Sequence, residues 1–415
     1  MKQMKVWRWV VAAALVLATA RVSAGSPRIT SLTMGGDLVF ETPNTGTIKH
    51  NYRVEGATSL GSAAWSMQRS VCGVGASARV TNPVSTDTDA MFYRVVATSN
   101  SATFVDGPYM AIDLSAGASA ANYLVTYYPS AASVPGGVTN DTYKTTKILM
   151  RLITKGCFTS GGWSTDYPGA YNSDHLQITL TKNFFIGVFE VTQRQWELVM
   201  GNRPSYFENT TYYQMRPVEM VSYYEIRENP LPPYLARIGS AISPNWPQSS
   251  QVHPDSFMGR MRAKTGLATF DLPTNAQWIY ARRAGTTAAL NSGKDVTNAD
   301  ICPNVAELGR YLYNGGGEYS RSCDLSAGTA IVGSYLPNAW GLYDMHGNVW
   351  EKCLDWWESV PKTLVDPTGP LSGTQRMALG GGFMNSAKWS ANTQSTTDPN
   401  CPLSVHGFRV AMTLP

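Results

Sequence analysis

The stretch Val332-Gly-Ser-Tyr-Leu-Pro-Asn-Ala-Trp-Gly-Leu-Tyr-Asp-Met-His-Gly-Asn-Val-Trp-Glu351, which continues through Lys-Cys-Leu-Asp-Trp-Trp357, decides the fold of this chain. It places Trp340, Trp350 and the pair Trp356-Trp357 among carboxylates, and buried indole rings supply a large apolar area. Gly341 and Gly347 allow the backbone to turn where a side chain would clash. The stretch predicts either a packed, turn-rich core with solvated carboxylates or a cation-stabilised platform beside a ligand site.

The first 24 residues have the pattern of a secretory signal peptide. A basic start (Lys2, Lys5, Arg8) precedes an apolar run over residues 9–20, and small residues end at Ala24. The run is about a dozen residues long, short of the roughly 20 that a membrane-spanning helix needs. We therefore expect a secreted, periplasmic or cell-surface protein with no transmembrane segment after signal removal. An uncleaved membrane anchor is the alternative.

The charge balance argues against a nucleic-acid partner. The 33 basic residues, less Lys2, Lys5, Arg8 and Arg21 of the signal, leave 29 to face 29 acidic residues. A neutral chain has no electrostatic footprint for nucleic acid or for an anionic membrane. The 37 glycines and 24 prolines are typical of a protein rich in β-strands and loops rather than long helices.

Residues 25–100 have short alternating apolar runs separated by turn residues, which predicts a small antiparallel β-sandwich-like module. Residues 101–142 are rich in Ala, Ser, Gly and Pro, and we interpret them as a linker with short strands, one at 123–128. Residues 143–415 form the third region, in which strands are expected at 143–153, 176–181 and 184–191.

Helix starts in this third region are marked by capping boxes, in which a hydroxyl caps a free N–H and a longer side chain reaches back. Thr192, Ser222 and Thr274 each begin such a box, and Ser256 is expected to cap a helix over 257–264. Gly201 and Gly285 are the expected stops of two of these helices. Few helices, many short strands and long loops indicate an irregular α+β domain.

Asp344 and Glu351 offer hard carboxylate oxygens on either side of the turn at Gly347, a combination that suits calcium. Zinc is not indicated, because the sequence holds neither Cys-x-x-Cys nor His-x-x-x-His. The scattered histidines leave open a site of two histidines and one carboxylate for iron. A solvated turn with capping carboxylates is the structural alternative.

Export permits disulfides among the six cysteines, and six cysteines allow 15 full pairings. Cys302 with Cys323, which bracket a glycine-rich loop, is the first expectation. Cys353 with Cys401 is the second.

Six motifs follow one another in the order found in the formylglycine-generating enzyme, or sulfatase-modifying factor, family, and the chain resembles that family from about residue 143 to 415. The motifs are Phe184-Phe-Ile-Gly-Val-Phe-Glu-Val-Thr-Gln-Arg-Gln-Trp196, Arg216-Pro-Val-Glu-Met-Val-Ser222, Leu272-Pro-Thr-Asn-Ala-Gln-Trp-Ile-Tyr-Ala281, Gly341-Leu-Tyr-Asp-Met-His-Gly-Asn-Val-Trp-Glu351, Gly380-Gly-Gly-Phe383 and Gly407-Phe-Arg-Val410. The resemblance implies an irregular α+β fold related to C-type lectins.

The resemblance also implies what is missing. Members of the family that oxidise a substrate cysteine hold copper with two cysteines, and the matching positions here are Asn385 and Ser390. Soft thiolates select Cu(I), so these residues argue against copper and against formylglycine formation. The usual turn serine is Gly382, and the family's Trp-Glu-Trp has become Trp350-Glu-Lys352. A calcium site of the family is retained, and its ligands correspond to Asp344, Gly347, Val349 and Glu351.

From these observations we expect a catalytically silent family member that binds a ligand. The expected surface is an exposed loop over residues 383–405, with Asn385, Trp389, Ser390 and His406 as contact residues. The partner class stays open between a protein and a small molecule or glycan, and the loop could also be a diversified surface. The competing hypothesis is a metal-dependent oxidoreductase of the formylglycine-generating or sulfoxide-synthase type that uses a different residue set.

Overall fold

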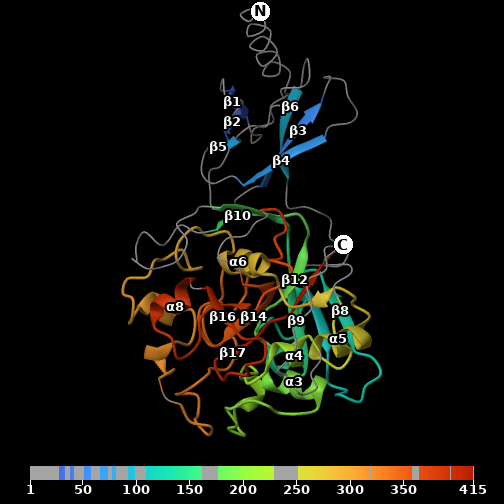
Figure 1. The fold of residues 1–415 in the computed structure, drawn as a ribbon, viewed down its shortest axis with the longest axis vertical. Coiled ribbons are helices and arrows are strands. Elements are labelled where there is room, and N and C mark those ends of the chain that lie inside the picture. The colour runs from blue at the N-terminus through green and yellow to red at the C-terminus, as the bar shows by residue number, and fades with distance from the viewer. Residues whose placement is uncertain are drawn as a thin grey trace, which may run out of the picture. The chain divides into compact units, whose positions relative to one another are not determined.

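The computed structural model describes residues 109–160, 176–228, 251–317, 319–357, 364–392 and 394–414, together with six strands of the N-terminal region (Figure 1). The chain divides into two compact units, Met1–Thr103 with Gly156–Phe158, and Phe104–Lys155 with Thr159–Pro415. The predicted signal peptide lies outside the described residues. Within the described part of the chain, no helix is long and apolar enough to cross a membrane.

The N-terminal unit contains two three-stranded sheets, ordered β1-β2-β5 and β4-β3-β6, and the strand pairs are antiparallel. Antiparallel strands are what the short alternating runs in this region predict. The strands are β1 (Arg28–Leu32), β2 (Leu38–Glu41), β3 (Asn51–Ala57), β4 (Ser66–Cys72), β5 (Ser77–Val80) and β6 (Phe92–Thr98).

The second unit is built on a six-stranded sheet of order β13-β18-β12-β9-β7-β8, in which neighbouring strands are antiparallel. Its core includes Phe270, Met150 and Phe408, none of which is exposed to solvent. The strands are β7 (Tyr109–Asp113), β8 (Leu124–Tyr128), β9 (Lys147–Ile153), β12 (Phe184–Gly187), β13 (Phe270–Asp271) and β18 (Ala411–Thr413).

The linker interpretation is wrong for residues 109–142, the described part of this region, although the strand expected at 123–128 is present as β8. Strand β7 pairs along its full length with β9, and Met110, Ile112 and Leu114 are completely buried. The Ala-, Ser- and Gly-rich stretches are the turns that connect β7, β8 and a short 3-10 helix, η1 (Ala131–Ser133). The small residues therefore belong to the connections, while the strands themselves are apolar. The strand expected from residue 143 is preceded by a short helix, α2 (Thr142–Thr145).

Four helices begin where the sequence predicts: α3 (Gln193–Met200), α4 (Tyr223–Ile226), α5 (Phe257–Thr265) and α6 (Asn275–Arg283). The capping boxes are confirmed; the Thr192 hydroxyl, for example, accepts the Gln195 N–H at 3.3 Å while the Gln195 amide oxygen accepts the Thr192 N–H at 3.0 Å. Helix α3 ends at Gly201 with φ of 81°. Helix α6 takes Ala284 rather than Gly285 as its left-handed cap.

A second sheet has the order β16-β15-β14-β17, and in it β14 pairs with β17 in parallel. Its strands are β14 (Trp350–Trp356), β15 (Arg376–Leu379), β16 (Gln394–Thr397) and β17 (His406–Gly407). The exposed loop expected over 383–405 instead contains helix α8 (Ala387–Asn392) and strand β16. The other elements are β10 (Gly156–Ser160), β11 (Leu176–Leu180), α7 (Pro303–Ala306), η2 (Tyr213–Met215) and η4 (Leu312–Asn314). Mixed sheets with few helices confirm the α+β class.

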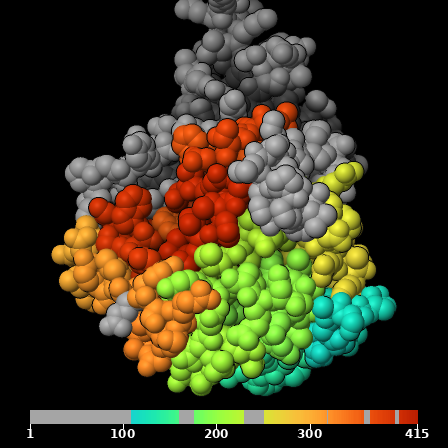
Figure 2. Space-filling view, turned by 60° about the horizontal axis from the view of Figure 1, so that its bottom comes forward, coloured from blue at the N-terminus to red at the C-terminus, as the bar shows by residue number. Residues whose placement is uncertain are grey.

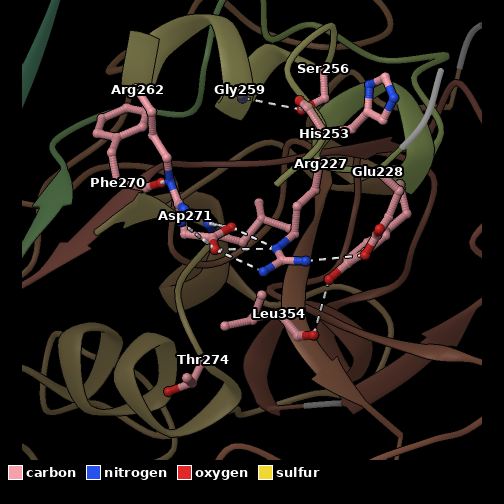
Figure 3. A network of polar contacts seen from close by, with 12 residues as sticks. Arg227, Glu228, His253, Ser256, Gly259, Arg262, Phe270, Asp271, Thr274 and Leu354 are labelled. Carbon is pink, nitrogen blue, oxygen red and sulfur yellow. Dashed lines mark hydrogen bonds and ion pairs between the residues drawn. The ribbon is translucent and has the colours of Figure 1, made fainter. Parts of the chain in front are cut away.

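A buried polar network joins α4, α5 and β13 (Figure 3). The Arg227 Nε donates to Asp271 Oδ1 at 2.9 Å, and the Arg262 Nη2 donates to Asp271 Oδ2 at 3.0 Å. Burial lowers the pKa of Arg262, and the Asp271 carboxylate counters that effect. One carboxylate thus holds two arginines from separate helical segments, an arrangement that fixes their orientation more than it adds stability.

Candidate functional site

The centre of the second unit holds three buried carboxylates, Glu190, Asp344 and Glu351, and one buried guanidinium, Arg409. The Arg409 Nε donates to Glu351 Oε2 at 2.6 Å, and its Nη2 donates to Glu351 Oε1 at 2.5 Å. The Trp278 indole N–H also donates to Glu351 Oε2, at 2.6 Å. Glu351 therefore accepts from a guanidinium and from a second donor, the arrangement that makes burial of a carboxylate tolerable.

Glu190 and Asp344 interact electrostatically with Glu351 and Arg409. Burial, then repulsion from Asp344 and Glu351, raises the pKa of Glu190 well above its usual range. Burial raises the pKa of Asp344 to about 6, against the lowering effect of the Gly333 N–H and of Arg409. Three carboxylates face one arginine, so the cluster carries more negative than positive charge when all are ionised.

Asp344 has one carboxylate oxygen without a partner among the described residues. It has a positive φ of 57°, and its Oδ2 accepts the Gly333 N–H at 2.6 Å. Its Oδ1 is buried and has no hydrogen-bond partner among the described residues. The described residues contain no group of three or more His, Cys, Asp or Glu side chains arranged to hold a metal. A cation here would need backbone carbonyls, which the expected set of Asp344, Gly347, Val349 and Glu351 includes, but both Glu351 oxygens accept from Arg409 in this structure.

The platform of residues 332–357 contacts a glycine turn at 380–385 through its backbone. The Gly347 N–H donates to the Gly380 carbonyl at 2.7 Å, and the Phe383 N–H donates to the Asn348 carbonyl at 2.7 Å. A Cβ at Gly381, where φ is 74°, would lie 2.6 Å from the Cα of Ser390. The turn can form in this tight space because these positions are glycine.

The four expected contact residues do not share one surface. Trp389 is 42% exposed, and Asn385 is half-buried with its Oδ1 accepting the Gly382 N–H at 2.9 Å. Ser390 and His406 are buried, at 1% and 5% exposure. The Ser390 Oγ has no hydrogen-bond partner among the described residues, and the His406 Nδ1 lies 3.3 Å from the Thr397 hydroxyl. Trp389 and Asn385 can thus meet a ligand directly, whereas Ser390 and His406 pack beneath.

His346 is a buried structural residue. Its Nδ1 lies 2.8 Å from the Ser390 carbonyl, and its Nε2 accepts the Asn291 N–H at 3.1 Å. Burial, followed by repulsion from Arg282, lowers its pKa to about 3. The ring is therefore neutral and links the platform to the segment after the glycine turn.

An aromatic cluster beside the glycine turn was not foreseen from the sequence. The rings of Tyr206 and Tyr319 stack with centroids 4.4 Å apart, and Tyr319 also lies parallel to Phe383 at 6.3 Å. Phe207 meets Phe383 edge to face at 5.3 Å. These residues come from three separate loops, so no local spacing or periodicity announces them.

Large apolar side chains surround the turn on the outside. We call this set the apolar rim: Tyr313 (50% exposed), Tyr319 (45%), Met384 (44%), Trp389 (42%) and Leu403 (39%). The Leu312 N–H donates to the Asn385 carbonyl, and the hydroxyls of Tyr319 and Ser404 are hydrogen-bonded, so the loops that carry the rim meet at the turn. Figure 2 shows the segments around residue 310 and residue 390 side by side on one face. Clustered exposed apolar side chains mark interaction surfaces.

Two buried arginines hold the loop that carries Tyr313 and Tyr319. Arg216 donates to the carbonyls of Thr329 at 2.7 Å and Asp324 at 2.5 Å. Arg310 donates to the carbonyls of Leu325 at 2.6 Å and Asn314 at 3.0 Å. Hydrogen bonds from a charged donor to carbonyls order a loop that has no regular secondary structure.

Both expected disulfides, Cys302 with Cys323 and Cys353 with Cys401, are wrong, because all four cysteines are free thiols. The Cys323 thiol donates to the Ala327 carbonyl, within its own loop. On β14 the neighbouring Lys352 reaches the Cys401 carbonyl at 3.4 Å. Since successive side chains of a strand point to opposite faces, Cys353 is directed away from Cys401.

Comparison with known proteins adds the family. The model of the sulfatase-modifying factor enzyme 1-like domain matches residues 137–414. The formylglycine-generating enzyme of Thermomonospora curvata is 35% identical over 153 residues, which are 34% of this chain and 48% of that enzyme. The chain therefore spans about half the length of that relative. The chaperone protein LppX of Paenibacillus barcinonensis is 31% identical over 242 residues, covering 54% of this chain and 77% of LppX.

Solved structures of similar fold include Treponema denticola variable protein 1, with 26% identity and a TM-score of 0.46 over 64% of this chain and 95% of that one. PvdO from Pseudomonas aeruginosa has 20% identity, a TM-score of 0.46 and the same coverage.

Proposed function

This chain belongs to the sulfatase-modifying factor enzyme 1-like domain family, and from that premise we propose that it binds an extended apolar segment of a partner protein at the apolar rim, without forming formylglycine. The observation that carries the proposal is the rim itself: five large apolar side chains, each 39–50% exposed, around the turn where the family's chemistry is expected. We further propose an exported location, on the signal-peptide pattern of residues 1–24.

The residues at the copper positions support catalytic silence. Asn385 offers an amide oxygen that is already bonded to the Gly382 N–H, and Ser390 offers a buried hydroxyl. Neither is a thiolate, and thiolates are the ligands that select Cu(I). Cys401 is the cysteine nearest to these positions in the sequence; it follows β16 in the chain and is half-buried.

Three observations support a protein segment as the partner. Exposed Tyr, Trp and Met side chains are enriched at protein interfaces and adapt to varied apolar partners. The rim is sustained by loops that the buried Arg216 and Arg310 keep in place, so a partner meets a preformed surface. A relative that this chain covers over 77% of its length is named a chaperone protein.

We also propose that calcium stabilises the platform, with Asp344 and Glu351 as carboxylate ligands and Gly347 and Val349 as carbonyl ligands, which requires Glu351 to give up one of its two bonds to Arg409. The buried, unpartnered Asp344 Oδ1 among the described residues supports this proposal. When bound, calcium would supply positive charge to the cluster of Glu190, Asp344 and Glu351 and would fix the backbone that contacts the glycine turn. In this role calcium is structural.

Binding is tested with the full chain and carboxymethylated α-lactalbumin, a permanently unfolded protein, as the probe in biolayer interferometry. We expect saturable binding that Tyr319→Ala and Trp389→Ala each weaken about tenfold, a typical loss for an aromatic residue central to an interface. Leu124→Ala is the matched control, because Leu124 is 69% exposed on β8 and lies outside the rim. Equal losses in all three variants, or no binding by the wild type, would contradict the proposal.

Catalytic silence is tested by loading the wild type with copper and measuring oxygen consumption on a cysteine-containing peptide. We expect no consumption above that of free copper and no stoichiometric copper after dialysis. Stoichiometric copper with turnover would instead favour the oxidoreductase with a different residue set.

A further inference from the structure

One buried carboxylate, that of Glu219, binds the backbone of the segment that supports Tyr319 of the apolar rim. Glu219 lies between η2 and α4, and its side chain is completely buried. Its Oε2 accepts the Tyr206 N–H at 2.9 Å, and its Oε1 accepts the Phe207 N–H at 3.2 Å. The Glu219 N–H also donates to the Ser205 hydroxyl at 3.3 Å. Glu219 therefore holds the backbone N–H groups of Tyr206 and Phe207, while the Gln193 amide donates to the Phe207 carbonyl at 3.0 Å.

The side chains of this fixed segment support Tyr319. The Tyr206 ring stacks on Tyr319 at an interplanar angle of 18°, and Phe207 meets the same ring edge to face at 5.9 Å. Phe207 also contacts Phe383 of the glycine turn. A change in the bonds that Glu219 makes would thus be felt by the exposed Tyr319 through two aromatic contacts.

We propose that Glu219 is a proton-dependent positioning residue for the binding surface: its ionised carboxylate holds Tyr206 and Phe207 beneath Tyr319, and protonation releases one of the two. This inference rests on the proposed function, because it concerns regulation of the same surface. An ionised carboxylate accepts on both oxygens, whereas a protonated one becomes a donor at one oxygen. The backbone N–H that was bonded to the protonated oxygen, that of Tyr206 or of Phe207, then loses its acceptor.

The surroundings of Glu219 place its change of protonation in the physiological pH range. Burial raises the pKa of Glu219 to about 7, against the lowering effect of the N–H groups of Tyr206 and Phe207, of Ser205 and of Arg216. Arg216 and Arg321 are the charged groups that face it, the first from its own segment and the second from the loop that carries Tyr319. Both bonds are complete above about pH 8 and one is weakened below about pH 6, a pH unit either side of that pKa.

The first experiment follows the stacked tyrosines of the full chain by near-ultraviolet circular dichroism between pH 5.5 and 8.5. We expect a sigmoidal change with a midpoint near neutrality in the wild type that is missing from Glu219→Gln, while any changes centred near pH 6 and pH 8, from Asp344 and Lys352, remain in both. Glu197→Gln is the matched control, because it removes a carboxylate that pairs with Arg194 on α3, and it should keep the wild-type curve. A flat wild-type curve, or the same curve in Glu219→Gln, would overturn the inference.

A second variant covers the case in which Glu219→Gln fails to fold, as judged by far-ultraviolet circular dichroism. Glu219→Asp keeps a titratable carboxyl in a different geometry, so the midpoint should move. An unchanged midpoint in this variant would assign the titration to another group and overturn the inference.

The binding experiment separates this inference from the proposed function. Wild-type affinity for carboxymethylated α-lactalbumin should be about fivefold higher at pH 8 than at pH 6, the weight of one net hydrogen bond. In Glu219→Gln the ratio should be close to one. If the probe binds equally at both pH values, the inference is overturned and the proposed function stands. If it binds at neither, the proposed function fails, and the dichroism curves alone decide the role of Glu219.

Discussion

The platform of residues 332–357 and the loop of residues 311–329 are each held by buried arginines from outside the segment, but these arginines bind different kinds of acceptor. In the platform Glu351 meets Arg409, a side chain, at 2.5 Å. In the loop Arg216 and Arg310 meet main-chain carbonyls instead. A side-chain pair requires particular residues at both ends and so leaves a motif in the sequence. A carbonyl is supplied by any residue, so an arginine-held loop leaves no such signature at its acceptors.

The largest effect expected from this contrast is in the platform. Replacing Arg409 by Met leaves the Glu351 carboxylate buried and unpaired, and we expect the free energy of unfolding to fall by about 3–5 kcal/mol. Urea unfolding of the full chain measures the loss. Arg321→Met is the control, because its ion pair with Glu208 is exposed and its removal should leave stability unchanged. A loss in Arg409→Met no greater than in this control would refute the contrast.

A buried charge without a counter-ion should behave in the opposite way. Lys352 is completely buried, makes no ion pair among the described residues, and has its pKa lowered by burial from 10.5 to about 8. The penalty from this group is absent above pH 10.5 and grows as pH falls from 10.5 to 8, because the unfolded state then binds a proton that the buried amine does not; it is fully present below pH 8. We therefore expect Lys352→Met to stabilise the chain at pH 7 by about 1–3 kcal/mol.

The pH dependence distinguishes this explanation from a gain in packing. The advantage of Lys352→Met over the wild type should shrink between pH 8 and 10.5 in urea unfolding experiments. An advantage that is constant over this range would show that the pKa of Lys352 is not lowered in the folded state.

Calcium should act on the platform alone. We expect calcium to stabilise the wild type by about 2.7 kcal/mol at a hundredfold excess over Kd, and Asp344→Ala to lose that response. Thermal unfolding with calcium and with a chelator measures it. Asp141→Ala, which removes an exposed carboxylate paired with Lys144, should respond as the wild type does. An undiminished response in Asp344→Ala would place calcium elsewhere.

The smallest change in stability is expected at the rim. Trp389 is 42% exposed, so Trp389→Ala should alter the free energy of unfolding by less than about 0.5 kcal/mol. The same variant should weaken the binding of carboxymethylated α-lactalbumin. Parallel urea unfolding and interferometry give both values. A large loss of stability would mean that Trp389 serves the fold and that its effect on binding is indirect.

The sequence predicts what local patterns encode. Thr192, Ser222 and Thr274 lie at the expected helix starts, because a capping box is complete within four residues. Asp344 and Glu351 lie in one buried cluster, as their motif suggests. The features that the sequence does not predict depend on contacts between residues far apart in the chain. Tyr206, Tyr319 and Phe383 come from three loops. Strand β7 pairs with β9 because its apolar side chains are buried, and the small residues on either side of β7 in the sequence hide this signal.

The position of β7 and β8 has a consequence for where this domain can be cut. The match to the family model begins at residue 137, after both strands, yet β7 covers the edge of β9 from Lys147 to Arg151. A fragment that starts at 137 would present a bare strand edge bordered by Ile148 and Met150, with a row of unpaired N–H and C=O groups. Such an edge recruits other chains. Fragments should therefore begin before Tyr109, and those that begin at the family boundary are expected to aggregate.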